Sequence, residues 1–186
     1  MVSDIVLAGM KEGIRALLAA GLDPVLVGGL AIQPHGRRRQ TMDADFLAIM
    51  EDSDFERVFR EGEAIGLKRD PKNPILRLGK MTILRLIHTD PRFGIEVRID
   101  VIQAHDTFLR ETVAKARTVD VFGIPLRLAT VECLILLKIL ADRPIDRIDA
   151  TELLDMNRER LDWDYLRAWA QKLQIATDLE ERERPQ

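Results

Sequence analysis

The sequence predicts a mixed α/β (α+β) fold, with a mixed β-sheet flanked by helices and a helical region at the C-terminus. Apolar residues recur at helical spacing in residues 3–20, and apolar and charged residues alternate in residues 95–101. The last third of the chain has the pattern of helices alone. A chain of 186 residues, 46% hydrophobic and 32% charged, is long enough for one folded core with an extension.

The composition excludes several classes of protein. A formal net charge of −3 lacks the basic excess of a general nucleic-acid binder, so that a polyanion would have to meet a local patch such as residues 37–39. The single Cys133 excludes an intrachain disulfide framework and is typical of core packing in a reducing compartment. The longest apolar run is far too short to span a bilayer, so we expect a cytoplasmic protein without a membrane partner.

The N-terminal part is predicted to alternate helices and strands. After the helix over residues 3–20, a short strand, Val25–Val27, ends in Gly28 and Gly29 and leads into a short helix ended by Gly36. The further elements of this part are a strand at 41–50, a helix at 53–65, hairpin strands at 75–78 and 81–88, and a strand at 95–101.

The C-terminal part is predicted to be helical. A helix at 106–116 and a hairpin at 118–128 complete an expected core of residues 1–128. Helices follow at 131–141, at 144–157 and after Asp162, so we expect residues 129–176 to form a helical region that closes one side of the cleft. Residues 177–186 are predicted to be a flexible tail, since their charged end lacks apolar periodicity.

Two aspartates interrupt the strand at 41–50. Strands disfavour Asp, and a period of two places Asp43 and Asp45 on one face. Their Cβ atoms would lie roughly 6–7 Å apart, within reach of one divalent ion or of a pair about 3.5–4 Å apart. Mg²⁺, with triphosphate oxygens completing its octahedron, is the natural partner. The alternative is a strand end with two solvated aspartates, which is the commoner situation for an isolated Asp-X-Asp.

Asp100 is a third carboxylate on the charged face of the strand at 95–101, beside Glu96 and Arg98. Neighbouring strands lie only about 5 Å apart, so three carboxylates can converge. In phosphoryl transfer a third carboxylate typically helps to bind the metal that activates the attacking hydroxyl, or takes its proton. The alternative is an aspartate on an edge strand, paired with Arg98.

The Gly28–Gly29 turn connects a strand to a helix, where backbone N–H groups and the helix dipole can hold phosphate. Such a turn by itself is more often a simple connector. Here enough residues separate it from Asp43 for a short helix and a return loop, so that the turn and the carboxylates can line one cleft. Lys138 interrupts an intensely apolar helix, and its ammonium either snorkels to solvent or points at an anion. His35 can touch a base or phosphate, or act as a local cap.

The residues Gly28-Gly29-Leu30-Ala31, His35-Gly36 and Arg39-Gln40-Thr41-Met42-Asp43-Ala44-Asp45 resemble the "GG-x-A … hG-x(n)-R-x-T-x-D-x-D" signature of minimal nucleotidyltransferases, in the superfamily of DNA polymerase β. The branch most similar to this pattern is that of the AbiEii-type abortive-infection toxins. That branch carries a Lys followed by Arg-x-x-Asp-x-x-Asp, matched here by Lys138, Arg143, Asp146 and Asp149. Many members have Ser after the first Gly, whereas this chain has Gly29-Leu30.

The resemblance implies Mg²⁺-dependent (or Mn²⁺-dependent) transfer of a nucleoside monophosphate from an NTP, such as ATP, to an acceptor, with release of pyrophosphate. The residues it implies are Gly28, Gly29, Arg39, Thr41 and Lys138 for the nucleotide, Asp43, Asp45 and Asp100 for the metal, and the three aspartates with Lys138 for catalysis. The acceptor stays open among tRNA, a protein and a small molecule, and a toxin-like role implies a cognate antitoxin or toxin as partner. A different class of function is a catalytically lapsed binding module that acts as an antitoxin-like partner, although the intact aspartates argue against decay.

Overall fold

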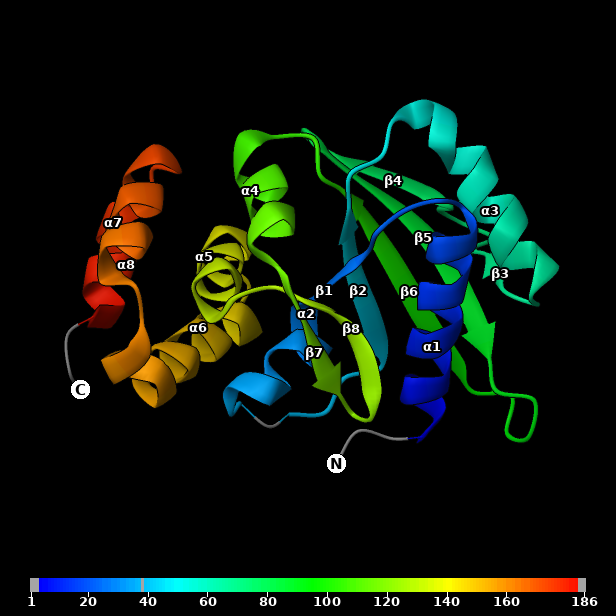
Figure 1. Cartoon of the computed structure of the whole chain (residues 1–186), viewed down its shortest axis with the longest axis horizontal. Helices are drawn as coiled ribbons and strands as arrows, with labels where there is room; N and C mark the ends of the chain where they lie inside the picture. Colours follow the sequence, from blue (N-terminus) through cyan, green and yellow to red (C-terminus); the bar gives the residue numbers. More distant parts are fainter. Residues whose placement is uncertain (1–3, 38, 184–186) are drawn as a thin grey trace.

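The computed structural model describes residues 4–37 and 39–183 (Figure 1). Its strands are β1 (Val25–Val27), β2 (Asp43–Ala48), β3 (Lys68–Arg69), β4 (Ile75–Leu78), β5 (Met81–Thr89), β6 (Glu96–Gln103), β7 (Arg117–Val121) and β8 (Ile124–Leu128). Its α-helices are α1 (Asp4–Ala19), α2 (Gly28–Ala31), α3 (Phe55–Ala64), α4 (Thr107–Lys115), α5 (Val131–Ala141), α6 (Pro144–Asn157), α7 (Trp163–Lys172) and α8 (Ala176–Glu183). Short 3-10 helices are η1 (Gln33–His35), η2 (Asp52–Asp54) and η3 (Arg158–Arg160).

The sheet is mixed, as the sequence predicts. Within the described residues its strands follow the order β3-β5-β6-β2-β1-β8-β7, and β4 pairs with β5. β2 runs parallel to β6 and antiparallel to β1, while β1 runs parallel to β8. The chain therefore returns to the centre of the sheet several times, and this brings β2 and β6, which carry the aspartates, side by side.

Helix α1 packs closely on one face of the sheet, with α3 beside it (Figure 1). An added Cβ would lie 2.7 Å from Val97 at Gly9 and 2.9 Å from Ile99 at Gly13, both under the closest approach of real Cβ atoms. Glycine is therefore required for this approach. Because Val97 and Ile99 face α1, the alternating position Asp100 faces the opposite side of the sheet.

The C-terminal helices begin at the caps that the sequence predicts. The Thr130 hydroxyl accepts a hydrogen bond from the Cys133 backbone N–H at 3.3 Å, and the Asp162 carboxylate accepts one from Tyr165 at 2.9 Å. Cys133 is buried in the core. In Figure 1, α5 to α8 lie at the opposite end of the molecule from α3.

The predicted flexible tail needs correction. The sequence predicts a tail from residue 177, whereas α8 continues to Glu183 in the structure. Its anchor is Leu179, which is only 1% exposed. One apolar side chain in a charged segment produces no periodicity, so the pattern alone misses this helix. Residues 184–186 lie outside the described residues.

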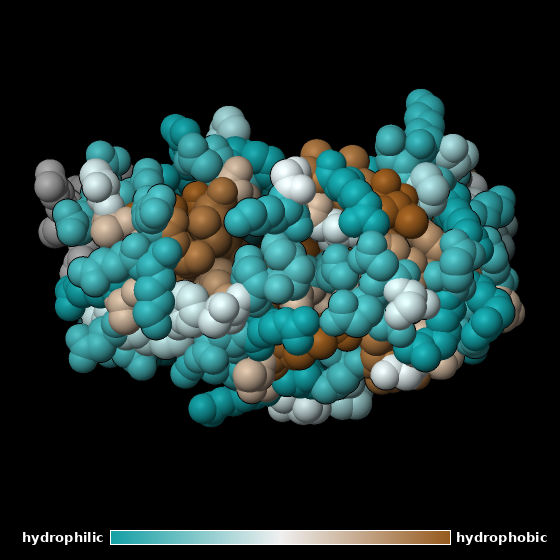
Figure 2. All heavy atoms as spheres, turned by 90° about the horizontal axis from the view of Figure 1, so that it is seen from above, coloured by the Kyte–Doolittle hydropathy of each residue, from teal (hydrophilic) through white to brown (hydrophobic). Residues whose placement is uncertain are grey.

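The surface is largely polar where Figure 2 displays it. Hydrophilic residues cover most of that face, and hydrophobic residues gather in smaller, separate areas between them. Each helix of residues 4–37 and 39–183 is too short or too polar to cross a membrane.

Candidate nucleotide and metal site

The three predicted aspartates lie on one face of the sheet. Asp43 and Asp45 point to the same side of β2, and Asp45 stands directly opposite Asp100 of β6 in the parallel register. This is the face away from α1. Strand β6 lies between β5 and β2, so Asp100 is not on the edge strand that the alternative assumed, although the ion pair with Arg98 that it also assumed is present.

Two arginines engage two of these aspartates. Arg85 of β5 binds Asp100 in a bidentate manner, with Nε at 2.8 Å and an Nη at 3.0 Å from the two carboxylate oxygens. Arg98 of β6 donates to Asp43 at 2.6 Å, and its Nε lies 3.6 Å from Asp100. Sequence reasoning missed Arg85. Its only signal was that it is the one arginine in the otherwise apolar run of the strand predicted at 81–88.

Asp45 carries a negative charge that its surroundings compensate poorly. Burial raises the pKa of Asp45 to about 6, and the nearby charges of Asp100 and Asp43 act in the same direction. Lys138 and the backbone N–H of Gly29 oppose this rise in pKa. A cation beside these carboxylates would relieve both effects, and carboxylate oxygens are the donors that Mg²⁺ prefers.

The aspartates fit a cation only if their arginine partners move. Among the described residues, no group of three or more His, Cys, Asp or Glu side chains is arranged to hold a metal ion. Arg98 occupies Asp43, but its side chain is 43% exposed and can turn away without disturbing the core. Arg85 is only 15% exposed and holds Asp100 with two bonds. The carboxylates of Asp43 and Asp45 can therefore bind a cation once Arg98 turns away, whereas Asp100 can join them only if Arg85 also moves.

The Gly28–Gly29 turn is packed between predicted site residues. Gly28 has a φ of +68°, and a Cβ there would lie 1.9 Å from an Asp45 carboxylate oxygen. At Gly29 a Cβ would lie 2.8 Å from an Arg39 Nη and 2.9 Å from the Thr41 hydroxyl. Any larger residue would therefore displace these side chains.

The turn differs in one respect from the predicted phosphate cradle. Helix α2 has only four residues, too few for the helix dipole that the sequence suggested, and the N–H of Gly29 already hydrogen-bonds Asp45. The side chains of Arg39 and Thr41 lie beside Gly29 and can face a phosphate at this turn.

Lys138 lies in a buried ion cluster between α5 and α6. It is 5% exposed, and its Nζ lies 2.8 Å from Asp146 and 2.9 Å from Asp149. The ammonium therefore does not snorkel to bulk solvent. It points at anions, which was the second alternative in the sequence analysis, but these anions are carboxylates of α6.

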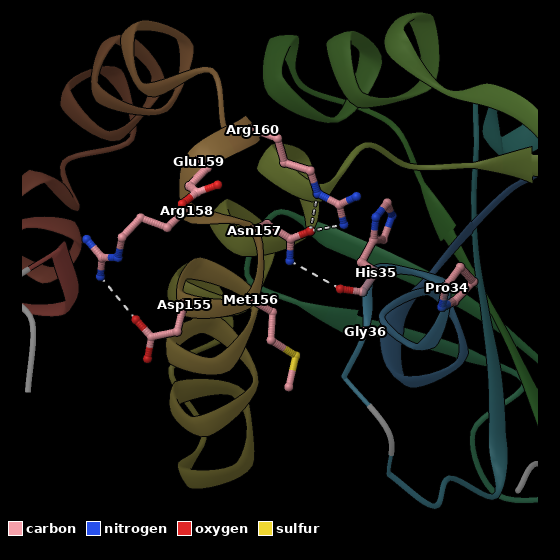
Figure 3. A pocket seen from close by; sticks show the side chains of 9 residues that line it. All are labelled: Pro34, His35, Gly36, Asp155, Met156, Asn157, Arg158, Glu159 and Arg160. Carbon is pink, nitrogen blue, oxygen red and sulfur yellow. Dashed lines mark hydrogen bonds and ion pairs between the residues drawn. The ribbon is translucent and has the colours of Figure 1, made fainter.

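A pocket of about 610 Å³ opens between η1 and the end of α6 (Figure 3). It is lined by Pro34, His35, Gly36, Asp155, Met156, Asn157, Arg158, Glu159 and Arg160. The Asn157 side chain, which is 2% exposed, donates to the His35 carbonyl at 3.2 Å and accepts from Arg160 at 2.8 Å. Asn157 thereby ties the segment after the Gly-Gly turn to α6.

His35 should make the stability of the protein sensitive to pH. Its Nε2 lies 3.3 Å from the Ala129 carbonyl. Burial lowers the pKa of His35 and the Arg160 charge adds to this, while Ala129 and Glu132 oppose it. Since the pKa of His35 in the folded protein lies below its ordinary value of 6.5, the unfolded chain binds the proton more readily. This contribution to stability is full above pH 6.5 and is lost as the pH falls.

The expected result is that His35→Gln flattens the pH dependence of unfolding. Urea titrations at several pH values between about 7 and 5 measure it, because the wild type should lose stability relative to the variant as histidine protonates. Parallel curves for the two proteins would contradict the assignment.

The mixed sheet, with these aspartates and the Gly-Gly turn on it, has the arrangement that the sequence predicted for a nucleotidyltransferase. The chain belongs to the family described as a nucleotidyl transferase of unknown function (DUF2204), whose model matches residues 6–182. No curated protein matches the chain. The predicted superfamily is thereby confirmed, while the toxin-like branch stays a prediction.

Solved structures share the fold at low sequence identity. JHP933 from Helicobacter pylori is 18% identical, with a TM-score of 0.53, over 88% of this chain and 72% of that one. The antibiotic-resistance factor ANT(2'')-Ia is 15% identical, with a TM-score of 0.55, over 96% and 100%. The lincosamide antibiotic adenylyltransferase LnuA, bound to lincomycin, is 15% identical, with a TM-score of 0.52, over 83% and 98%. These similarities confirm the predicted fold.

Proposed function

We propose that the chain transfers a nucleoside monophosphate from an NTP to an acceptor, with Mg²⁺ or Mn²⁺ held by Asp43, Asp45 and Asp100. The observation that carries the proposal is the convergence of three carboxylates on one face of the sheet, where Asp45 stands directly opposite Asp100 and on the same side of β2 as Asp43. A divalent cation supplies charge stabilisation at phosphoryl oxygens and makes a bound hydroxyl a better nucleophile.

The protein's own side chains have separate roles in this proposal. Arg39 and Thr41, which lie beside Gly29, contact the triphosphate, and the Gly28–Gly29 turn lets these side chains and Asp45 approach the backbone closely. Asp100 either completes the metal site or takes the proton of the acceptor hydroxyl, and both roles require Arg85 to release one of the two oxygens that it holds. Lys138 offsets negative charge at the site without a direct contact, since its ammonium lowers the pKa of Asp45 through space.

The acceptor class that the fold neighbours favour is a small molecule with a free hydroxyl. ANT(2'')-Ia has been solved in complex with adenylyl-2''-tobramycin, and LnuA with lincomycin. The pocket of about 610 Å³ beside η1 has the size of a small-molecule site. A tRNA or protein acceptor, with a toxin-like role and a cognate partner, is the second candidate, carried by the Lys138 to Asp149 pattern of the AbiEii-like branch.

Incubation with labelled NTPs, Mg²⁺ and a fractionated cell extract tests the proposal. We expect label in an acceptor with the wild type and none with Asp45→Asn, and the fraction that carries the label gives the acceptor class. A wild type that binds no NTP and transfers no label would contradict the proposal and favour the catalytically lapsed binding module.

A further inference from the structure

Asp149 of α6 lies at the centre of a cluster that joins two parts of the chain. Its carboxylate is fully buried, and three cations surround it. The Lys138 Nζ lies at 2.9 Å, the Arg37 Nε at 3.2 Å and the Arg39 Nε at 3.2 Å. Lys138 belongs to α5, whereas both arginines follow the Gly-Gly turn. The cluster therefore connects the C-terminal helices to the predicted phosphate contacts.

Fold stability alone does not account for such a cluster. Burying charges is costly, and apolar residues of similar volume often stabilise a protein equally well or better. Asp149 is fully buried and would be better replaced by an apolar residue if packing were its only role. An apolar residue at this position could not orient the guanidinium of Arg39.

The orientation of Arg39 follows from its contacts. Its Nε lies against Asp149, and one Nη donates to the Gln40 carbonyl at 3.2 Å. The other Nη lies over the turn, 2.8 Å from where a Cβ of Gly29 would be. The guanidinium is planar, so fixing its Nε edge also fixes the direction of this Nη.

The contact between Arg39 and Asp149 is electrostatic in character. The two atoms are at ion-pair distance, but their angle does not satisfy a hydrogen bond. A charge contact of this kind depends on the negative charge of Asp149 more than on its shape, so a neutral isostere should release Arg39. Lys138 offsets the charge of the same Asp149 oxygen, with its Nζ at 2.9 Å.

We propose that Asp149 is a positioning residue that directs Arg39 toward the triphosphate at the Gly28–Gly29 turn, with Lys138 as its counter-ion. The inference rests on the proposed function, because it assumes that Arg39 contacts an NTP. In this proposal Lys138 acts by pairing with Asp149 and Asp146, and it does not contact a phosphate directly.

A double-mutant cycle tests the inference, with ATP and Mg²⁺ titrated into the full chain by calorimetry. Arg39→Gln and Asp149→Asn should each weaken ATP binding by about 10-fold, the loss expected for one charged hydrogen bond. The double variant should bind about as weakly as Arg39→Gln alone, because both changes remove the same contact. If Asp149 only supports the fold, the double variant should lose affinity for ATP by the product of the two single losses. That result would overturn the inference.

Glu152→Gln is the matched control. Glu152 is the other partner of Arg37, at 2.6 Å from its Nη, and does not engage Arg39. Its replacement should leave ATP affinity within about 2-fold of the wild type, as for an ion pair remote from the ligand. A loss equal to that of Asp149→Asn would show that any charge on α6 suffices, and the assignment to Asp149 would be wrong.

A second comparison covers the case in which Asp149→Asn does not fold. Asp149→Asn with Lys138→Met removes one charge of each sign and leaves Asp146 with Arg143. This pair of changes should weaken ATP binding as much as Arg39→Gln, and unchanged binding overturns the inference. If the wild type itself binds no ATP, the proposed function fails and takes the inference with it. If the wild type binds and the variants match it, the inference alone fails.

Discussion

Asp45→Asn should lower the rate of nucleotidyl transfer by about 100-fold or more, the scale of losing a key electrostatic group in a site. The same change should leave the free energy of unfolding intact or raise it. Burial and the charges of Asp100 and Asp43 raise the pKa of Asp45 to about 6, so the ionised carboxylate is unfavourable in the folded protein at pH 7. Removing this charge should stabilise the fold by on the order of 1 kcal/mol.

Label transfer and urea unfolding at pH 7 measure the two effects on the same preparation. Asp164→Asn on the exposed side of α7 makes the same chemical change away from the sheet and should alter neither quantity. Loss of activity together with loss of stability in Asp45→Asn would indicate a structural carboxylate and contradict the account.

Lys138→Met should lower the free energy of unfolding by about 3–5 kcal/mol, the cost of removing one partner from a buried ion pair. Asp146 and Asp149 are fully buried, and both lose the ammonium that lies 2.8 and 2.9 Å from them. From the sequence alone we would expect Lys138→Met to leave the free energy of unfolding unchanged or to raise it. Methionine keeps the apolar packing of the lysine stem, whether the ammonium reaches solvent or a ligand.

Chemical denaturation of the wild type and of Lys138→Met measures this difference in the free energy of unfolding. Lys11→Met on the exposed side of α1 is the matched control and should change stability by less than about 0.5 kcal/mol. Unchanged unfolding of Lys138→Met would mean that the buried cluster contributes little to the folded state.

The candidate site could be predicted from the sequence where the argument is local. The two-residue period of a strand places Asp43 and Asp45 on one face, and the alternation in residues 95–101 places Asp100 on the charged face of its strand. The caps Thr130 and Asp162 follow from the residues at helix starts.

What the sequence misses depends on contacts between distant elements. Arg85 meets Asp100 only because β5 and β6 pair in one register, and no local pattern specifies that register. The partners of Lys138 lie on the next helix, and their meeting requires the turn at Asp142, which adopts a φ of +49°. Sequence periodicity shows which face a residue occupies, but not which residue of another element will face it.

Titration of ATP into the wild type, with Mg²⁺ and again with a chelator, tests the central claim most directly. The account predicts that ATP affinity falls by at least about 10-fold when the divalent ion is removed, and that Asp45→Asn binds ATP equally weakly with and without Mg²⁺. Equal affinity of the wild type in the presence and absence of Mg²⁺ would contradict a metal site at Asp43, Asp45 and Asp100.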